Sequence, residues 1–265
     1  MILGGGQGVT RKALKNKPLA EAIFELRWDL QETAPQIKID PHYKLLVGTL
    51  YNELQNEYEH HEQLITASMP DEITGYMPQH RFRKGKSKWP LIQIGPGVIT
   101  VNDTEGYIWE DFEKRIIRAV YALFKVYPDS EKNLKINQLQ LRYINAIEFD
   151  FEKDNIFTFL REHMKTGVTL HQALFEDTGV EDLPLNFDLK FSFPSAKPKG
   201  TVNIRFGHGK KNNADAMLWE TMVQSKEDDA AKMKDKIADW IDGAHKLTDD
   251  WFFKLIKGEL LERFQ

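Results

Sequence analysis

The segment KPLAEAIFELRW, residues 17–28, alternates apolar and polar side chains over its second half. The apolar side chains stand at every second position: Ala22, Phe24, Leu26 and Trp28. Successive side chains of a β-strand point to opposite faces, so the other face carries Glu21, Glu25 and Arg27. The segment therefore predicts a strand with one strongly apolar face.

A helix, three short strands and a second helix are predicted to follow this strand. Asp40 and Pro41 are typical of a helix start, with Asp as the cap and Pro in the first turn. Apolar residues then recur at helical spacing, at Tyr43, Leu46, Val47, Leu50 and Leu54. Strands are expected at residues 75–82, 89–94 and 98–102. A long amphipathic helix should begin near Thr104 and stop before Pro128.

The second half of the chain repeats this order of elements. The expected elements are a strand at residues 138–149, a helix capped by Asp154, strands at 185–193, 202–206 and 217–224, and a helix from Met233 to Leu260. This last helix is longer than a typical globular helix, so a bend is expected near Gly243 or Thr248.

The repeated order predicts an α+β fold built from two pseudo-repeats of strand, helix, three-strand meander and long helix. Meanders with one apolar face need a cover, so we expect one antiparallel sheet with helices on one side. The arrangement resembles a duplicated TATA-box-binding-protein-like or helix-grip fold. The predicted units are a flexible leader (1–16), a first half (17–130) and a second half (131–265), with the two halves forming one compact unit.

The composition excludes several classes of protein. The 265 residues include no cysteine, so disulfide scaffolds, thiolate zinc sites, iron–sulfur clusters and cysteine nucleophiles are ruled out. There are 36 basic and 40 acidic residues, and this net charge of −4 argues against a surface that binds nucleic acid all over. No stretch is apolar for long enough to suggest a membrane span or a signal peptide, so a cytoplasmic protein is expected.

Two basic segments are candidate binding sites for nucleic acid or another anionic ligand. The first contains Arg81, Arg83, Lys84, Lys86, Lys88 and Trp89. Its cations could neutralise phosphates while the aromatic ring stacks on a base, or the segment is simply a solvated hairpin tip. The second contains His208, Lys210 and Lys211 between glycines and asparagines. It could form an anion-binding nest, or be a long flexible loop between two strands.

A third candidate is a set of polar residues within the two apolar first strands. Its members are Glu21, Glu25, Arg27, Arg142 and Asn145. If these strands pair, the side chains could line a ligand groove on the open face of the sheet, or form ion pairs that fix the strand register. His60 and His61 are expected near the end of the first helix, where adjacent histidines point in different directions. We predict no metal site, no cofactor and no catalytic residues from these patterns.

Three segments together resemble an uncharacterised, sporadically distributed bacterial protein family of about this length. They are PLAEAIFELRW at residues 18–28, which matches the N-terminal family motif PLxEAIFELRW, LRYINAI at 141–147, and the run from Ala244 through Trp251 to Leu260. The family has no established activity, so the resemblance implies little about mechanism. Its patchy distribution implies a setting in a mobile or anti-phage defence system.

The leading functional hypothesis is a non-catalytic binding or adaptor protein with a protein partner. The alternatives are a nucleic-acid-binding protein that uses the basic meander loops, and an enzyme of unidentified class. The C-terminal helix carries more apolar residues than one face needs, which suggests a homodimer.

Overall fold

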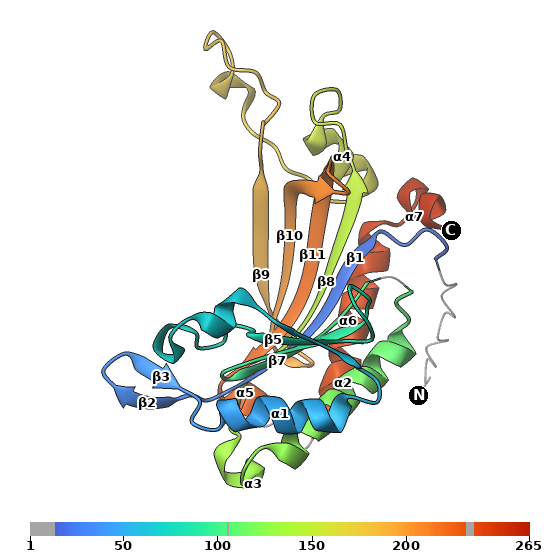
Figure 1. Cartoon of the computed structure of the whole chain (residues 1–265). Coiled ribbons are helices and arrows are strands. Elements are labelled where there is room, and N and C mark those ends of the chain that lie inside the picture. Colours follow the sequence, from blue (N-terminus) through green and yellow to red (C-terminus); the bar gives the residue numbers. More distant parts are fainter. Residues whose placement is uncertain (1–13, 105, 232–235) are drawn as a thin grey trace, which may run out of the picture.

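The computed structural model describes residues 14–104, 106–231 and 236–265; most of the predicted leader lies outside them. The described residues form an α+β fold around a nine-stranded sheet in which every pairing is antiparallel (Figure 1). Its strands are β1 (Leu19–Trp28), β4 (His60–Gln63), β5 (His80–Arg83), β6 (Leu91–Gly95), β7 (Val98–Asp103), β8 (Ile136–Glu148), β9 (Asp188–Ala196), β10 (Lys199–Lys211) and β11 (Ala214–Lys226). A separate hairpin consists of β2 (Gln31–Ala34) and β3 (Ile37–Ile39). The predicted α+β class with one large antiparallel sheet is confirmed.

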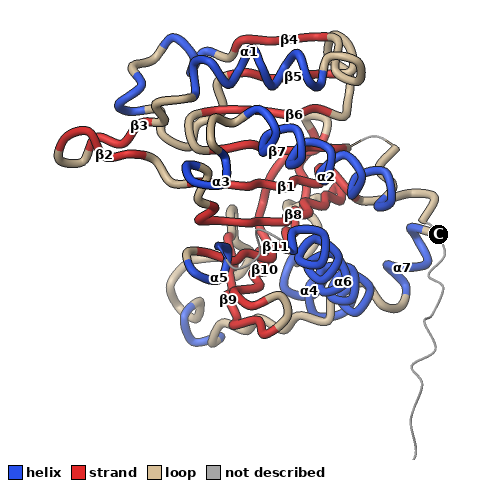
Figure 2. The backbone as a smooth tube through the Cα atoms, turned by 90° about the horizontal axis from the view of Figure 1, so that it is seen from below, coloured by secondary structure: helices blue, strands red, loops and turns tan. Residues whose placement is uncertain are grey.

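The first strands of the two halves pair with each other in the middle of the sheet. The strand order is β4-β5-β6-β7-β1-β8-β11-β10-β9, and Figure 2 shows these strands in this sequence. In the central β1–β8 pair, Glu25 lies opposite Gln140 and Phe24 opposite Leu141. Residues of the first half therefore lie on one side of this pair, and residues of the second half on the other.

The α-helices that contribute to the core pack on one face of the sheet. The helices are α1 (Tyr43–Leu54), α2 (Trp109–Val126), α3 (Ser130–Asn133), α4 (Ile156–His163), α5 (Asp228–Ala231), α6 (Ile237–Leu255) and α7 (Glu259–Phe264). The main core joins the apolar face of β1, including Phe24 and Leu26, to α1, α2 and Trp240 of α6. A second core joins β8, β10 and β11 to α4 and α7. Among the helices of the described residues, none combines the length and the apolar composition that a membrane span needs.

The strand predicted within residues 17–28 is confirmed as β1. The helix predicted to end before Pro128 is confirmed as α2. The apolar side chains of β1, from Ala22 to Trp28, are fully buried, because the helices cover them. Helix α2 ends at Val126, two residues before Pro128. Asp40 accepts the backbone N–H of His42 at 3.0 Å, but it is not the predicted helix cap, because α1 begins at Tyr43 with His42 in the cap position.

Several predicted helix boundaries are wrong. Helix α2 begins at Trp109 rather than near Thr104, and Asn155 rather than Asp154 caps α4, since its side chain accepts the backbone N–H of Thr158 at 3.0 Å. His60 and His61 belong to strand β4, because α1 ends at Leu54 and His61 pairs with Phe82 of β5. The final helix is shorter than predicted: α6 ends at Leu255, and α7 follows Gly258, whose φ of 113° interrupts a helix. The expected start at Met233 lies outside the described residues.

The predicted loop at residues 207–213 is a hairpin of two long strands. Strand β10 continues to Lys211, and β11 begins at Ala214. The connection is Asn212-Asn213, with φ values of 51° and 67°. Two consecutive positive φ values are typical of the two-residue turns that fit the twist of a hairpin, and Asn tolerates them well.

Candidate functional site

The face of the sheet opposite the helices carries mostly polar side chains. Because side chains alternate along each strand, the strand register determines which of them share this face. We call it the polar face, and its members include Glu62, Arg81, Arg83, Gln93, Thr100, Asn102, Glu21, Glu25, Arg27, Gln138, Gln140, Arg142, Glu220 and Gln224. The face spans strands from both halves of the chain.

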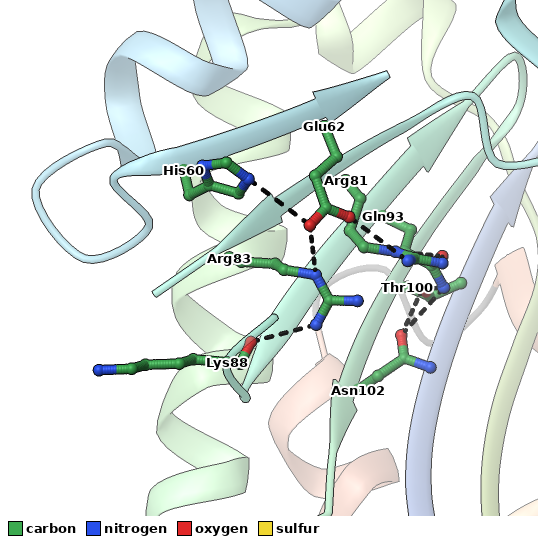
Figure 3. Close-up of polar contacts among 8 residues, drawn as sticks. All are labelled: His60, Glu62, Arg81, Arg83, Lys88, Gln93, Thr100 and Asn102. Carbon is green, nitrogen blue, oxygen red and sulfur yellow. Dashed lines mark hydrogen bonds and ion pairs between the residues drawn. The ribbon is translucent and has the colours of Figure 1, made fainter. Parts of the chain in front are cut away.

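An ion-pair cluster occupies the β4–β5 end of the polar face (Figure 3). The Glu62 carboxylate lies 2.9 Å from Nε of Arg83, 3.4 Å from a terminal nitrogen of Arg81, and 3.6 Å from Nε2 of His60. Partial burial raises the pKa of Glu62, but the neighbouring guanidinium groups outweigh this effect and hold its pKa below the usual 4.5. Arg83 also donates to the backbone oxygen of Lys88 at 3.1 Å.

A chain of hydrogen bonds continues from this cluster across β6 and β7 (Figure 3), and a last bond joins it to β1. Arg81 donates to the Gln93 side chain at 3.0 Å, and Gln93 donates to Thr100 at 3.3 Å. Thr100 donates to Asn102 at 2.6 Å, and Asn102 donates to Glu21 at 2.7 Å. Thr100 and Asn102 are both 4% exposed, so this part of the face is fixed by satisfied polar contacts rather than by solvent.

Two separate sets of polar contacts lie over the central strands and in the second half. Glu25 lies 2.7 Å from Nε of Arg27 and accepts a hydrogen bond from Gln138 at 3.0 Å. Arg142 and Glu220 form a longer ion pair of 3.7 Å between β8 and β11. Nε of Arg142 has no hydrogen-bond partner among the described residues, which leaves a donor in the middle of the face.

The structure brings together four of the five residues of the predicted polar cluster. Glu21, Glu25, Arg27 and Arg142 all lie on the polar face. Asn145 lies on the opposite, helix-covered face, because it is three residues from Arg142 along one strand. The spacing of three residues between Arg142 and Asn145 is visible in the sequence, and it already indicates that the two side chains lie on opposite faces of the strand.

The first basic segment divides into paired arginines and exposed lysines. Arg81 and Arg83 are engaged by Glu62 and the polar network, and the Arg83 guanidinium lies 5.5 Å from the centre of the half-buried Trp89 ring. The remaining cations are exposed at the β5–β6 connection: Lys84, Lys86 and Lys88.

The second basic segment lies on β10 rather than in a loop. His208 contacts Asp215 at 2.9 Å, and its ring lies 4.0 Å from the Phe151 ring. Lys211 donates to the backbone oxygen of Ala146 at 3.3 Å, whereas Lys210 is exposed.

The apolar side chains that suggested a homodimer are partly used inside the molecule. Ile256 is fully buried, Phe252 stacks on Trp219 at 6.3 Å, and Trp251 contacts Phe193 edge-on at 5.9 Å.

Sequence reasoning missed a cavity of about 430 Å³ on the helix-covered side. Its lining includes Tyr107, Tyr143 and His245, whose side chains form one hydrogen-bonded chain. These residues are far apart in the sequence, and only the packing of α6 against β8 brings them together. In the described part of the chain, no three His, Asp or Glu side chains gather in a way that could hold a metal ion.

Comparison of the chain with protein-family models, with curated proteins and with solved structures gave no match. The family resemblance of the three sequence segments therefore stays a prediction, and the function has to be inferred from the geometry of the site.

Proposed function

We propose that the chain is a non-catalytic binding protein that holds a protein partner on its polar face. The observation that carries this proposal is that charged and amide side chains from strands of both halves form several small networks of ion pairs and hydrogen bonds on the face opposite the core-forming helices. Such networks fix each side chain before a partner arrives, which lowers the entropic cost of binding.

The topology also supports two pseudo-repeats of the TATA-box-binding-protein-like or helix-grip type. The second half runs from β8 through α4 and the three-strand meander β9–β11 to α6. The first half departs from the predicted order, because the β2–β3 hairpin lies between β1 and α1 and its meander has four strands, β4–β7. The two first strands form the central antiparallel pair. A partner bound across β1 and β8 would then contact equivalent strands of both halves.

The charge of the polar face favours a protein over a nucleic acid as the partner. Arg27, Arg81 and Arg83 are each matched by a carboxylate within 3.4 Å. A face with balanced charges lacks the positive excess that phosphate backbones require, whereas it suits the mixed charges of a protein surface.

The test exchanges the charges of one pair without removing the pair. In the double variant Arg142→Glu/Glu220→Arg, the cross-strand ion pair stays but its direction on the face is reversed. We expect a partner that co-purifies with the tagged wild-type chain from its native host to be lost from this variant, because its own charges would meet like charges.

The matched control exchanges Asp242 and Lys246, an exposed pair of 2.5 Å on helix α6. This variant should retain the partner. Equal retention by the wild type and both variants would contradict binding through the polar face, and so would the absence of any specifically retained protein.

Nucleic-acid binding is the second candidate, and the exposed Lys84, Lys86 and Lys88 favour it. If these lysines contact phosphates, the triple alanine variant should weaken binding of single-stranded DNA or RNA and reduce the salt dependence of log K by about 2 to 3. The lysines are better targets than Arg83, because Arg83 also holds β4 through Glu62. No binding by the wild type at low salt would eliminate this candidate.

A further inference from the structure

The cavity on the helix-covered side is separate from the polar face. It lies between the start of β1, the residues that lead into α2, strands β8 and β11, and helix α6. A volume of about 430 Å³ is within the range of small-molecule sites in proteins. The cavity is therefore large enough to hold a small-molecule ligand.

Aromatic side chains form much of the wall of the cavity. Trp109 stacks on His245 with a ring separation of 3.7 Å and an angle of 10° between the planes. The Tyr143 hydroxyl is 3.0 Å from the Tyr107 hydroxyl and 3.0 Å from Nδ1 of His245. Burial raises the pKa of both tyrosines, so they stay protonated at neutral pH. Such walls suit a flat ligand of low charge.

Two buried polar side chains that line the cavity lack hydrogen-bond partners. Asn145 is 3% exposed and Thr221 is 2% exposed, and they lie on the neighbouring strands β8 and β11. Neither side chain makes a hydrogen bond with another described residue. Because both residues line the cavity, their hydrogen-bonding groups are available to a ligand that bonds to both. The Asn carboxamide offers both a donor and an acceptor.

The charges that line the cavity disfavour an anionic ligand. Glu110 contributes a carboxylate, and no arginine lies among the described lining residues. The one lining lysine, Lys17, donates to the backbone oxygen of Tyr107 at 2.5 Å. A phosphate or carboxylate group would therefore meet a like charge.

We propose that this cavity binds a neutral, planar heteroaromatic molecule of the size of a nucleobase or nucleoside. Its ring lies against the aromatic wall, and its hydrogen-bonding edge contacts Asn145 and Thr221. This site is independent of the partner proposed for the polar face, so either proposal can fail without the other.

The test is isothermal titration of the full chain with adenine, adenosine, guanosine, cytidine and uridine, and with the corresponding nucleoside 5′-monophosphates. We expect one-to-one binding of at least one neutral compound with a Kd below about 1 mM. Its monophosphate should bind at least about fivefold more weakly, because the phosphate would meet the Glu110 carboxylate and no arginine among the described lining residues.

Thr221→Val separates ligand binding from folding. Valine has the shape of threonine without its hydroxyl, so the variant keeps the packing at this position and should unfold within about 2 °C of the wild type. Its affinity for the ligand should nevertheless fall about fivefold to tenfold. Asn145→Leu should weaken binding in the same way.

The matched control is Thr74→Val, at a hydroxyl that is also fully buried but accepts a hydrogen bond from Gln79 at 2.9 Å. This variant should unfold at a lower temperature and keep its affinity for the ligand.

Three outcomes would overturn the proposal: no neutral compound binds, binding is unchanged in both Thr221→Val and Asn145→Leu, or the monophosphate binds more tightly than its nucleoside. The comparison of nucleosides with their monophosphates uses the wild-type chain, so it tests the proposal even if a variant does not fold.

Discussion

Three tryptophans are almost fully buried and differ in what their indole N–H contacts. Trp28 donates to the Asp40 carboxylate at 2.9 Å, and Trp240 donates to the Ser225 hydroxyl at 2.8 Å. The N–H of Trp219 has no hydrogen-bond partner among the described residues. All three are at most 1% exposed. They therefore form a natural series in which burial is constant and hydrogen bonding varies.

When each tryptophan is replaced by phenylalanine, the loss in the free energy of unfolding should depend on whether the indole N–H makes a hydrogen bond. Each change removes similar ring volume, so the cavity cost is comparable. Trp28→Phe and Trp240→Phe should each lower the free energy of unfolding by about 1–3 kcal/mol more than Trp219→Phe, because they leave buried acceptors short of a donor. Urea unfolding of the three variants measures this difference. Equal losses at all three sites would show that packing alone sets the cost.

The neighbouring rings of His61 and His80 make the stability sensitive to pH. Nε2 of His61 lies 2.8 Å from Nδ1 of His80. Burial, followed by the charge of His61, lowers the pKa of His80 below its usual 6.5. A lowered folded-state pKa means that the unfolded chain binds the proton more tightly, so this contribution to stability is present above pH 6.5 and is lost as the pH falls.

The variant His80→Phe should therefore flatten the decline in stability between pH 7 and pH 5. The measurement is the free energy of unfolding in urea as a function of pH. His171→Phe is the control, because His171 is exposed and lies in a different part of the chain. A decline of the same slope in His80→Phe and in the wild type would refute the assignment.

At the scale of elements, the short strand β4 forms one edge of the sheet and depends on one carboxylate. β4 has four residues and pairs only with β5 in the sheet order. Glu62 connects it to Arg81 and Arg83 on β5. Because the folded-state pKa of Glu62 is held below 4.5, its contribution is present above that pH and is lost as the pH falls through the lowered value.

Glu62→Gln should loosen β4 in particular. We expect a loss of about 2 kcal/mol at pH 7, because Arg83 would remain largely buried without its counter-charge. The difference from the wild type should shrink as the pH falls below 4.5. Hydrogen exchange should show faster exchange of the backbone amides at residues 60–63, with β8 unaffected. Slower or unchanged exchange in β4 would contradict this role.

At the scale of the whole molecule, one core holds the two halves together. Phe24 and Leu26 from the first half lie in the same cluster as Leu139, Leu141 and Trp240 from the second. A chain cut between the halves would expose the apolar face of each central strand and the hydrogen-bonding edge between β1 and β8.

Fragments 17–130 and 131–265 should therefore not fold separately. Each alone should lack a cooperative thermal transition in circular dichroism, and the two produced together should recover one. A sharp transition of fragment 17–130 alone would show that the halves are independent domains.

The sequence predicted those features that follow from short-range patterns. Alternation in residues 17–28 predicted β1 and its buried face, and Pro128 predicted the end of α2. Short-range patterns gave the wrong prediction for His60 and His61, which lie in a strand rather than near the end of a helix, because a four-residue strand is too short for its periodicity to be recognised. They also failed at residues 207–213, where the Asn212-Asn213 turn allows two strands to continue through a glycine-rich segment.

The sequence by itself determined the α+β class, the positions of β1, α1 and α2, and the polar character of one face of β1. Burial of one side of a strand or helix leaves a pattern in neighbouring residues, so these features can be read locally. Only the tertiary structure decided that Glu62 would join β4 to β5, and that Tyr107, Tyr143 and His245 would meet around a cavity. Such contacts depend on which distant elements pack together, and no spacing along the chain encodes that choice.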